Sequence, residues 1–415
     1  MLKNKKIIII ILIIEIVTIC SFAKADDEDE EEFLNDEIVN QTIETVSDTT
    51  DEPILNARSA VIYDRTTKQM IWGKNENDRR AMASTTKIMT AIVVIENSNL
   101  QDIVTISKKA ANTGGSRLKI KEKDKISVND LLYGLMLRSG NDAAVALAEY
   151  VGGSIDGFAN MMNKKAEELQ LKNTHFVTPH GLDDDNHYTT AFELAIISDY
   201  ALNNEIFRKI VKTKSSSISI NGVNRNIYNT NELLGNMYGV DGIKTGFTNK
   251  AGRCLVTSCT RGENQIITVV LGCDAKKQRT SDSVRLIEYA FKNYTRVNIE
   301  DMVKKEFEKW KQINQKRIYI NKAQNNKIEF KIEDIHIKTL PIKISEKKNI
   351  VIEINAIYNY EAPMREDTKI GNIIVKNKDK IIESIDILCA KEIERKNIFS
   401  YLKEIIDSYN LNIIL

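Results

Sequence analysis

The chain has 415 residues, of which 42% are hydrophobic and 28% are charged, with only 4 prolines and 18 glycines. This composition is typical of a globular protein with more than one domain, and it excludes collagen-like, disordered and polytopic membrane proteins. The formal net charge is +1, from 59 basic and 58 acidic side chains, and gives no indication of nucleic-acid binding. That small total conceals three segments of very different charge.

The first segment, residues 1–25, has the features of an export signal. Three lysines within the first six residues precede an apolar run from Ile7 to Cys20, and Ala23-Lys-Ala25 offers small residues where a signal peptidase cleaves. The run is too short and too interrupted for a transmembrane helix. We therefore expect cleavage after Ala25, with an uncleaved N-terminal anchor as the alternative. Either way, the body would work outside the cytoplasm, at the cell wall or the outer face of the membrane.

The second and third segments carry opposite charge. Residues 26–52 contain thirteen acidic side chains and no lysine or arginine, which predicts a disordered acidic spacer. Residues 53–415 hold the remaining 55 basic and 44 acidic side chains, a net charge of +11. A basic body suits work beside an anionic surface.

Residues 53–295 predict an α+β domain. Strands are expected at 59–63, 68–72, 240–245, 253–260 and 265–272, and helices at 84–97, 128–138, 142–151, 154–169, 190–201 and 282–293. Strands, then a helical block, then strands and a closing helix are typical of a largely antiparallel sheet packed against helices.

The remaining residues predict a different architecture. Four segments of alternating apolar and polar residues within 296–390 indicate a small all-β domain. Residues 391–415 predict an amphipathic C-terminal helix, with Ile398, Leu402 and Ile405 on one face. That face can pack on the protein or lie in a membrane surface, and the sequence leaves both interpretations open.

Metal and cofactor signatures are not found in the sequence. There is no C-x-x-C pair, and His175, His180 and His187 are five and seven residues apart in a predicted loop, which matches no standard zinc pattern. We expect no metal site and no cofactor. There is also no P-loop and no nucleic-acid module.

Ser84-Thr-Thr-Lys87 is the first candidate for chemistry. It places a hydroxyl at a helix start and an amine one turn later on the same face. A serine is a poor nucleophile unless a base lies within hydrogen-bond reach, and the helix N-terminus favours developing negative charge. The spacing alone is weak, since it recurs at four other serines: Ser21, Ser116, Ser345 and Ser400.

Sequence context distinguishes Ser84 from these four. It alone begins a long apolar helix, and two further polar motifs follow it at domain-scale spacing. Ser139-Gly-Asn141 lies in a predicted helix–helix connection, and Lys244-Thr-Gly246, the only K-T-G in the chain, lies on a predicted strand. The ordered set of three motifs is much more specific than any one of them.

With these motifs the chain resembles the serine-type D-alanyl-D-alanine carboxypeptidases, which are low-molecular-weight penicillin-binding proteins. The resemblance covers roughly residues 55–295 and extends more weakly over 362–375. It rests on four stretches: Ala83-Ser-Thr-Thr-Lys-Ile-Met-Thr90, Leu137-Arg-Ser-Gly-Asn-Asp-Ala-Ala144, His175-Phe-Val-Thr-Pro-His-Gly-Leu182 and Asp241-Gly-Ile-Lys-Thr-Gly-Phe-Thr248. It implies a β-lactamase/DD-peptidase-like fold, peptidoglycan stem peptides as substrates and acylation by β-lactam antibiotics.

The resemblance also implies catalytic roles. Ser84 would attack the carbonyl between two D-alanines and form an acyl-enzyme, with Lys87 as general base. Ser139 would relay a proton toward the departing D-alanine. Asn141 would bind the substrate amide and orient Lys87.

The remaining implied residues bind substrate. Lys244 would depress the pKa of Lys87 and attract the terminal carboxylate, to which Thr245 would hydrogen-bond. The oxyanion hole would be the backbone N–H groups of Ser84 and Phe247. Some relatives carry histidine at position 247, so the phenylalanine leaves substrate preference open. Arg279, 35 residues beyond Lys244, is a second candidate contact for the carboxylate.

Three alternatives accompany this hypothesis. A D,D-endopeptidase would cut cross-links with the same residues. A β-lactamase would need a second general base between the S-x-N and K-T-G motifs, and Glu167 and Glu168, the early candidates, lie in a predicted helix without the surrounding motif. A non-catalytic wall-binding protein would be expected to have lost one of the three motifs, and all are intact.

Overall fold

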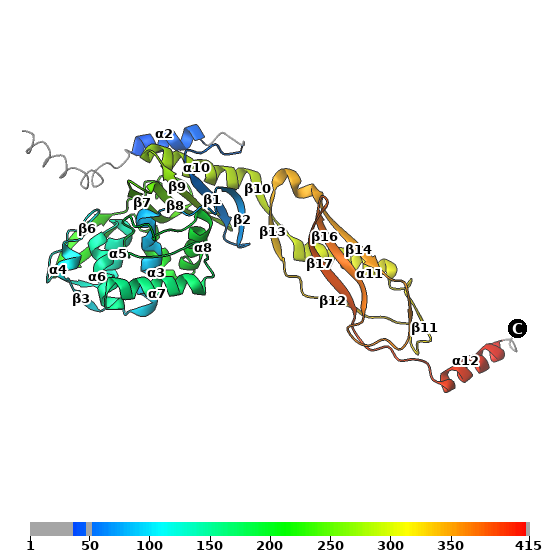
Figure 1. Ribbon diagram of the computed structural model, residues 1–415. Helices are drawn as coiled ribbons and strands as arrows, with labels where there is room; N and C mark the ends of the chain where they lie inside the picture. The colour runs from blue at the N-terminus through cyan, green and yellow to red at the C-terminus, as the bar shows by residue number, and fades with distance from the viewer. Residues whose placement is uncertain (1–35, 47–51, 412–415) are drawn as a thin grey trace, which may run out of the picture. The chain divides into compact units, whose positions relative to one another are not determined.

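The structure, a computed structural model, describes residues 36–46 and 52–411 and consists of two compact units that divide between Lys292 and Asn293 (Figure 1). The sequence predicted this division between residues 295 and 296, and it also predicted the signal, which lies outside the described residues.

The first unit is built on a five-stranded antiparallel sheet. The strands lie in the order β2-β1-β9-β8-β7. Their bounds are β1 Ser59–Asp64, β2 Gln69–Lys74, β7 Val240–Thr248, β8 Gly252–Arg261 and β9 Asn264–Cys273. The two N-terminal strands therefore form one side of a sheet that three strands from much later in the chain complete.

Both faces of this sheet are covered. Every residue of β1 is buried, and eight consecutive residues of β9 are buried, whereas the edge strand β2 is only half-buried. Continuous burial requires packing on both faces, because successive side chains point to opposite sides of a strand. In Figure 1 the helical block covers one face and the long helix α10 the other.

Nine described helices and two two-stranded ribbons accompany the sheet in the first unit. The helices are α2 Asp36–Val46, α3 Lys87–Asn97, α4 Lys108–Ala111, α5 Val128–Leu137, α6 Asn141–Gly152, α7 Ile155–Glu168, α8 Ala191–Ala201, α9 Glu205–Lys212 and α10 Lys276–Asn293. The ribbons are β3 Ile103–Thr105 with β4 Lys125–Ser127, and β5 Ser215–Ile220 with β6 Val223–Tyr228.

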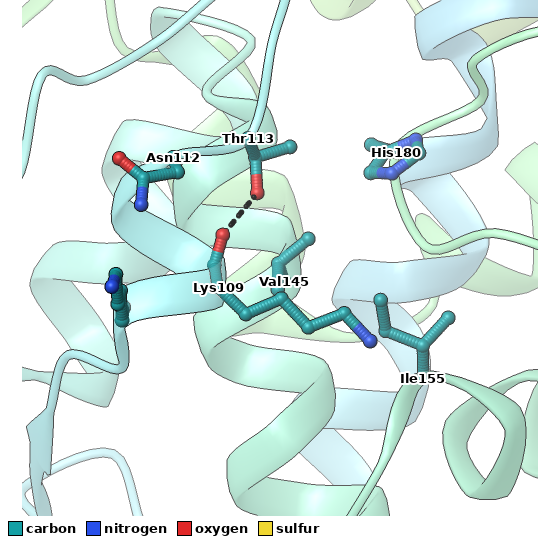
Figure 2. A pocket seen from close by; sticks show the side chains of 7 residues that line it. Lys109, Asn112, Thr113, Val145, Ile155 and His180 are labelled. Carbon is teal, nitrogen blue, oxygen red and sulfur yellow. Dashed lines mark hydrogen bonds between the residues drawn. The ribbon is translucent and has the colours of Figure 1, made fainter.

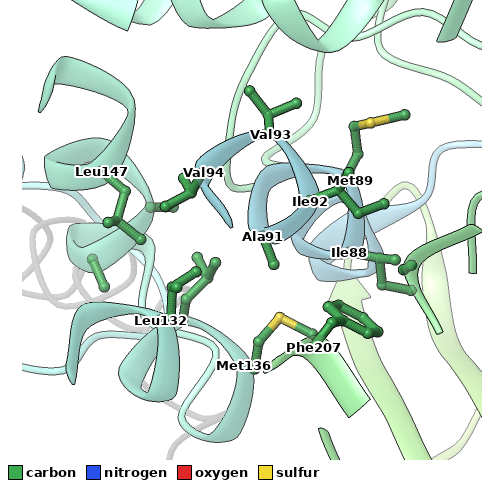
Figure 3. Packing of buried hydrophobic residues seen from close by; sticks show 14 of the residues in the cluster. Ile88, Met89, Ala91, Ile92, Val93, Val94, Leu132, Met136, Leu147 and Phe207 are labelled. Atoms are coloured by element: carbon green, nitrogen blue, oxygen red, sulfur yellow. The ribbon is translucent and has the colours of Figure 1, made fainter. Parts of the chain in front are cut away.

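Helix α3 lies at the centre of the first unit. All its residues from Lys87 to Val94 are buried. Figure 3 shows α3 side chains packed among Leu132 and Met136 of α5, Leu147 of α6 and Phe207 of α9. A helix that is buried all round is anchored on every side, so its first turn is held rigidly.

The sequence predicted a helix at most of these places, with small differences in the bounds. Ser84 precedes α3 in a 3₁₀ turn, η1 Ala83–Thr86, and α10 begins at Lys276 instead of 282. Helices α4 and α9 and the two ribbons were not predicted. They are short elements, and their stability comes from packing that periodicity does not reveal.

The predicted disordered spacer is wrong over part of its length. Residues 36–46 form helix α2, in which the side chains of Val39 and Thr42 are buried. The acidic composition of 26–52 dominated the prediction, although a few apolar residues in this segment recur at helical spacing. Burial of Val39 can stabilise a helix whose surface is charged.

The second unit combines a four-stranded antiparallel sheet with a helix. The sheet order is β12-β17-β16-β14, and helix α11 contacts β14. The bounds are β10 Tyr294–Asn298, α11 Ile299–Asn314, β11 Tyr319–Asn321, β12 Phe330–Ile332, β13 Thr339–Lys343, η2 Ile344–Asn349, β14 Ile350–Ala356, β15 Asn359–Glu361, β16 Lys369–Asn377, β17 Lys380–Cys389 and α12 Ile398–Leu411.

The expectation of an all-β second domain therefore needs a correction at α11. Val303, Phe307 and Trp310 line its buried face and join one apolar cluster with the sheet. Asn298 caps its first turn by accepting the backbone N–H of Asp301. The Asn298 cap and the helical spacing of the apolar residues are visible in the sequence. The alternation of apolar and polar residues in the strands that follow nevertheless led to an all-β prediction for the whole region.

Helix α12 ends the described chain with an exposed apolar face. Ile398, Phe399, Leu402, Ile405, Ile406 and Tyr409 are all exposed. The predicted helix over 391–415 is thus present at 398–411, and the structure places no protein surface over these side chains. Within the described ranges, no helix has the length and apolar character needed to cross a membrane.

Candidate active site

The turn that carries Ser84 is tightly constrained. Ala83 adopts a left-handed backbone conformation, with a φ of 47°, which is uncommon for a residue with a Cβ. The hydroxyl groups of Thr85 and Thr86 donate to the carbonyl groups of Met82 and Ala83, at 2.5 and 2.8 Å. Strained, over-determined backbone of this kind is concentrated at functional sites. The result is a half-buried Ser84 held at the N-terminal end of α3.

Lys87 occupies the centre of the site. Its side chain is fully buried, and its Nζ lies 2.8 Å from Ser84 Oγ, 2.7 Å from Asn141 Oδ1 and 2.8 Å from the carbonyl oxygen of His180. Burial lowers the pKa of Lys87 well below its usual value, and the charge of Lys244 lowers it further, against the opposing effect of Asp142. Both effects favour the neutral amine over the ammonium.

The partners of Lys87 suit a neutral amine acting on a hydroxyl. An amide oxygen and a backbone carbonyl can only accept, so they take the two N–H groups of the uncharged amine. Its lone pair is then directed to the third partner, Ser84 Oγ, whose proton it can accept. This is the geometry that general-base activation of a serine requires.

A tight turn presents the His180 carbonyl to Lys87. Gly181 has a φ of +89°, and a Cβ at this position would lie 1.9 Å from the Ala83 carbonyl oxygen. Only glycine allows the loop to approach the nucleophile turn so closely. His187 strengthens the contact, because its Nδ1 accepts the backbone N–H of Val177 and its Nε2 lies 2.8 Å from Thr86 Oγ1.

The second motif supplies another partner of Lys87. Ser139, which is 6% exposed, adopts a φ of 60° between α5 and α6, and Asn141 begins α6. The orientation of the Asn141 amide is fixed, since its Nδ2 donates to the Gly114 carbonyl at 2.8 Å while its Oδ1 accepts from Lys87. The neighbouring Asp142 is fully buried and accepts the backbone N–H groups of Leu118 and Ile120. These bonds hold the loop that carries Gly114 against the start of α6.

The third motif lies on β7, which packs directly against the nucleophile turn. A Cβ at Gly246 would be 3.0 Å from the backbone nitrogen of Ser84, so the strand backbone passes close beside that N–H. Lys244 is 1% exposed, and its Nζ donates to the Thr245 carbonyl at 3.0 Å. The Thr245 hydroxyl lies 2.7 Å from that of Thr230. Ammonium, hydroxyl and strand backbone thus line one wall beside Ser84.

A buried ion pair accompanies Lys244. The guanidinium of Arg279 pairs with Glu232, and both side chains are 3% exposed. Thr280 also donates to Glu232, at 2.5 Å. Burial lowers the pKa of Lys244 to about 7, with a further contribution from the charge of Arg279. Burial tends to raise the pKa of Glu232, but Arg279 and Thr280 outweigh it, so Glu232 stays ionised.

Phe247 marks the outer end of this wall. The Arg253 guanidinium carbon lies 3.7 Å from the centre of its ring, a cation–π contact across β7 and β8. One residue on, the Thr248 hydroxyl donates to Asp183 at 2.6 Å. This bond links β7 to the segment that carries His180.

The three histidines discussed as metal ligands serve other purposes here. The ring nitrogens of His187 bond Val177 and Thr86, His175 Nδ1 lies 2.6 Å from the Asn186 carbonyl, and His180 Nδ1 accepts the backbone N–H of Leu182. No group of three potential ligands gathers anywhere in residues 36–46 and 52–411.

The structure brings Ser84, Lys87 and Asn141 into direct contact and places Lys244 and Thr245 on the adjoining strand. The roles of Ser139 and Phe247 stay predictions, as does a substrate contact for Arg279, whose guanidinium is engaged with Glu232. Sequence reasoning missed the carbonyl groups of His180 and Gly114. Backbone acceptors leave no residue-type signature, although the glycines at 114, 115 and 181 mark the turns concerned.

Comparisons with known proteins agree with this geometry. The family model described as D-alanyl-D-alanine carboxypeptidase matches residues 46–275. The D-alanyl-D-alanine carboxypeptidase DacF of Bacillus subtilis is 31% identical over 362 residues, which cover 85% of this chain and 90% of that protein. DacD of Escherichia coli is 33% identical over 370 residues, again 85% of this chain and 90% of that protein. The crystal structure of DacD from Francisella tularensis superposes with a TM-score of 0.66 at 27% identity, covering 84% of this chain and 96% of that one.

Proposed function

Since the chain belongs to the D-alanyl-D-alanine carboxypeptidase family, we propose that it removes the terminal D-alanine from peptidoglycan stem peptides through an acyl-enzyme on Ser84. The chain is a serine-type peptidase, and penicillins would acylate the same serine. The observation that carries the proposal is the set of three partners around Lys87 Nζ, two of which only accept hydrogen bonds.

Acylation begins with proton transfer. Neutral Lys87 takes the proton of the Ser84 hydroxyl as Oγ attacks the carbonyl carbon of the penultimate D-alanine. The carbonyl oxygen becomes an oxyanion that accepts from the backbone N–H groups of Ser84 and Phe247. The C–N bond then breaks, and the proton passes through the Ser139 hydroxyl to the nitrogen of the departing D-alanine.

Deacylation returns the enzyme to its starting state. Water attacks the ester carbon and gives up a proton to Lys87. The C–Oγ bond then breaks, Lys87 returns the proton to Ser84 Oγ, and the shortened peptide is released. Lys87 serves as the base in both steps, so the site needs no glutamate as a second general base. The β-lactamase candidate Glu168 instead forms an ion pair with Lys165 on α7.

Binding of the terminal carboxylate falls to the wall formed by β7. Lys244 supplies positive charge and Thr245 a hydroxyl donor, both at a buried site where a charge-assisted bond is strong. Asn141 has one N–H of its amide left after bonding Gly114, and this can donate to the substrate amide carbonyl.

The proposal extends to location. A chain with an export signal at 1–25 works outside the cytoplasm, where its substrate lies. The exposed apolar face of α12 supports attachment to a membrane surface, because six large apolar side chains gathered on one helix are costly to leave in water. An enzyme tethered in this way would stay beside the inner layers of the wall.

The test is to incubate the purified chain with a pentapeptide ending in D-Ala-D-Ala and to measure free D-alanine by mass spectrometry. We expect one D-alanine per peptide and a persistent Ser84-dependent adduct with a fluorescent penicillin. Absence of both would contradict the proposal. Rapid penicillin turnover would indicate a β-lactamase, and cleavage of cross-linked dimers in preference to pentapeptides would indicate an endopeptidase.

A further inference from the structure

The segment that carries Glu232 runs alongside the wall of β7. Glu232 lies two residues after Thr230, whose hydroxyl is 2.7 Å from that of Thr245. Between them, the Asn231 amide donates to the carbonyl of Gly242, also on β7, at 3.0 Å. These two bonds hold the segment against the strand on which we expect the substrate carboxylate to bind. Glu232 is therefore a fixed neighbour of that binding site.

Arg279 reaches the same wall from α10. Burial lowers the pKa of Lys244, and the charge of Arg279 lowers it further. Burial raises the pKa of the Cys254 thiol, and the charge of Arg279 is among the effects that oppose this rise. Cys254 of β8 lies opposite Gly246 of β7, so the guanidinium is close to the K-T-G segment on two strands. An uncompensated guanidinium there would attract a carboxylate, because arginine is always charged.

Glu232 compensates this charge. The two side chains form an ion pair and are each 3% exposed, so little water screens them. Burial favours the neutral acid, but Arg279 and a hydroxyl bond from Thr280 outweigh it, which lowers the pKa of Glu232 and keeps it ionised. Opposite charges in contact nearly cancel at a distance. Lys244 then supplies the positive charge of the wall.

The hydrogen bonding of the pair is incomplete. Glu232 Oε2 and Arg279 Nε are both buried, and neither has a hydrogen-bond partner in the described part of the chain. A buried pair stabilises a fold only when its remaining donors and acceptors are also satisfied. Stability alone therefore does not account for a half-satisfied pair at this position.

We propose that Glu232 is a specificity-determining residue, which cancels the charge of Arg279 beside the carboxylate site and so weakens the preference for a free carboxylate on the leaving residue. The inference rests on the proposed function, which supplies the peptide. A leaving residue whose carboxylate is amidated, or joined to a further residue, would lose little in such a site. Glu232 acts through Arg279 and need not touch the substrate.

The test compares two pentapeptides that end in D-Ala-D-Ala and differ only in a free or an amidated terminal carboxyl. Release of D-alanine or D-alaninamide gives kcat/KM for each peptide, and the ratio of the two values is the readout. Measurement at about pH 6, below the pKa of Lys244, keeps Lys244 charged. Glu232→Gln should raise the ratio about three- to tenfold in favour of the free carboxylate, through a lower KM for that peptide.

The double variant Glu232→Gln/Arg279→Gln separates charge from structure. It loses the ion pair but has the same net charge at this position as the unmodified chain, so its ratio should stay within about twofold of the original. Partial unfolding of any variant lowers kcat/KM for both peptides alike and leaves the ratio unchanged.

Two control variants change charge elsewhere. Glu288→Gln breaks a partly buried pair with Arg261 on the same helix α10, and Lys109→Gln removes an exposed charge from the pocket that α4, α6 and His180 border (Figure 2). Both should leave the ratio as it is.

An unchanged ratio in Glu232→Gln would overturn the inference, and so would an equal shift in the double variant. If the unmodified chain releases neither product, the proposed function fails. The same ratio is then taken from the rates of acylation by a penicillin and by its methyl ester. A chain that reacts with none of the four probes would overturn the inference as well.

Discussion

The interiors of the two units differ in the charge that they bury. The first unit buries Lys87, Lys244 and Arg279 together with Asp142 and Glu232, while Asn314 is the only buried polar residue in the described part of the second unit. Burying a charge costs free energy unless it is paired and hydrogen-bonded. A unit can therefore fold around an apolar core alone, as the second does, and the buried lysines beside Ser84 in the first unit are explained by chemistry and not by stability.

The sharpest test of this contrast replaces the base. Lys87→Met keeps the shape of the side chain without leaving an unpaired charge, and we expect acylation by a fluorescent penicillin to fall by roughly 10³- to 10⁴-fold. The chain should still fold, which circular dichroism would show. The control uses the same S-x-x-K spacing in the second unit. Lys348→Met, at an exposed position three residues after Ser345, should leave labelling unchanged. Normal labelling of Lys87→Met would refute the assignment of the base.

The next effect concerns stability. Glu232→Gln leaves the shape of the buried pair intact but removes the charge that compensates Arg279, so we expect the first unit to lose about 3 kcal/mol of its free energy of unfolding. Chemical denaturation measures this loss. In the second unit, Glu353→Gln breaks a partly exposed pair with Lys376 and should hardly move the transition. Equal losses in both units would mean that the buried pair contributes no more to the free energy of unfolding than a partly exposed one.

A smaller effect is expected at α12. Leu402→Asp places a charge on the exposed apolar face and should weaken binding to phospholipid vesicles about tenfold or more, without changing penicillin labelling. Ser400→Asp adds the same charge to the opposite face of the helix and serves as the control. If both variants float with vesicles as well as the unmodified chain, attachment through α12 is excluded.

The smallest effect is a displacement of the pH profile. Acylation needs neutral Lys87 and charged Lys244, so kcat/KM should rise with pH through the lowered pKa of Lys87 and fall as Lys244 loses its proton near pH 7. Removing the ion pair as a whole, with Glu232→Gln and Arg279→Gln together, takes away a charge that lowers the pKa of Lys244. The descending limb should then move to higher pH. A limb that stays in place would show that another group controls it.

The sequence predicted much of this site because three short motifs fix its reactive side chains. It predicted the antiparallel sheet from the order of its elements, strands followed by a helical block and then by strands and a helix. It missed α11 because the strands beyond it set the pattern for the whole segment. It could not predict that the His180 carbonyl would face Lys87, since that contact depends on how closely Gly181 approaches Ala83. Backbone acceptors and close approaches arise from three-dimensional packing, which the spacing of residues in the sequence does not reveal.

We infer that Lys87 is neutral when it meets Ser84, and an NMR titration measures its protonation state directly. The chain would be labelled with ¹³C at lysine Cε, and the Lys87 signal would be assigned by its absence from the Lys87→Met spectrum. We expect this signal to titrate well below the usual lysine pKa of 10.5. A Lys87 signal that titrates at or above 10.5 would show that Lys87 is charged when it meets Ser84.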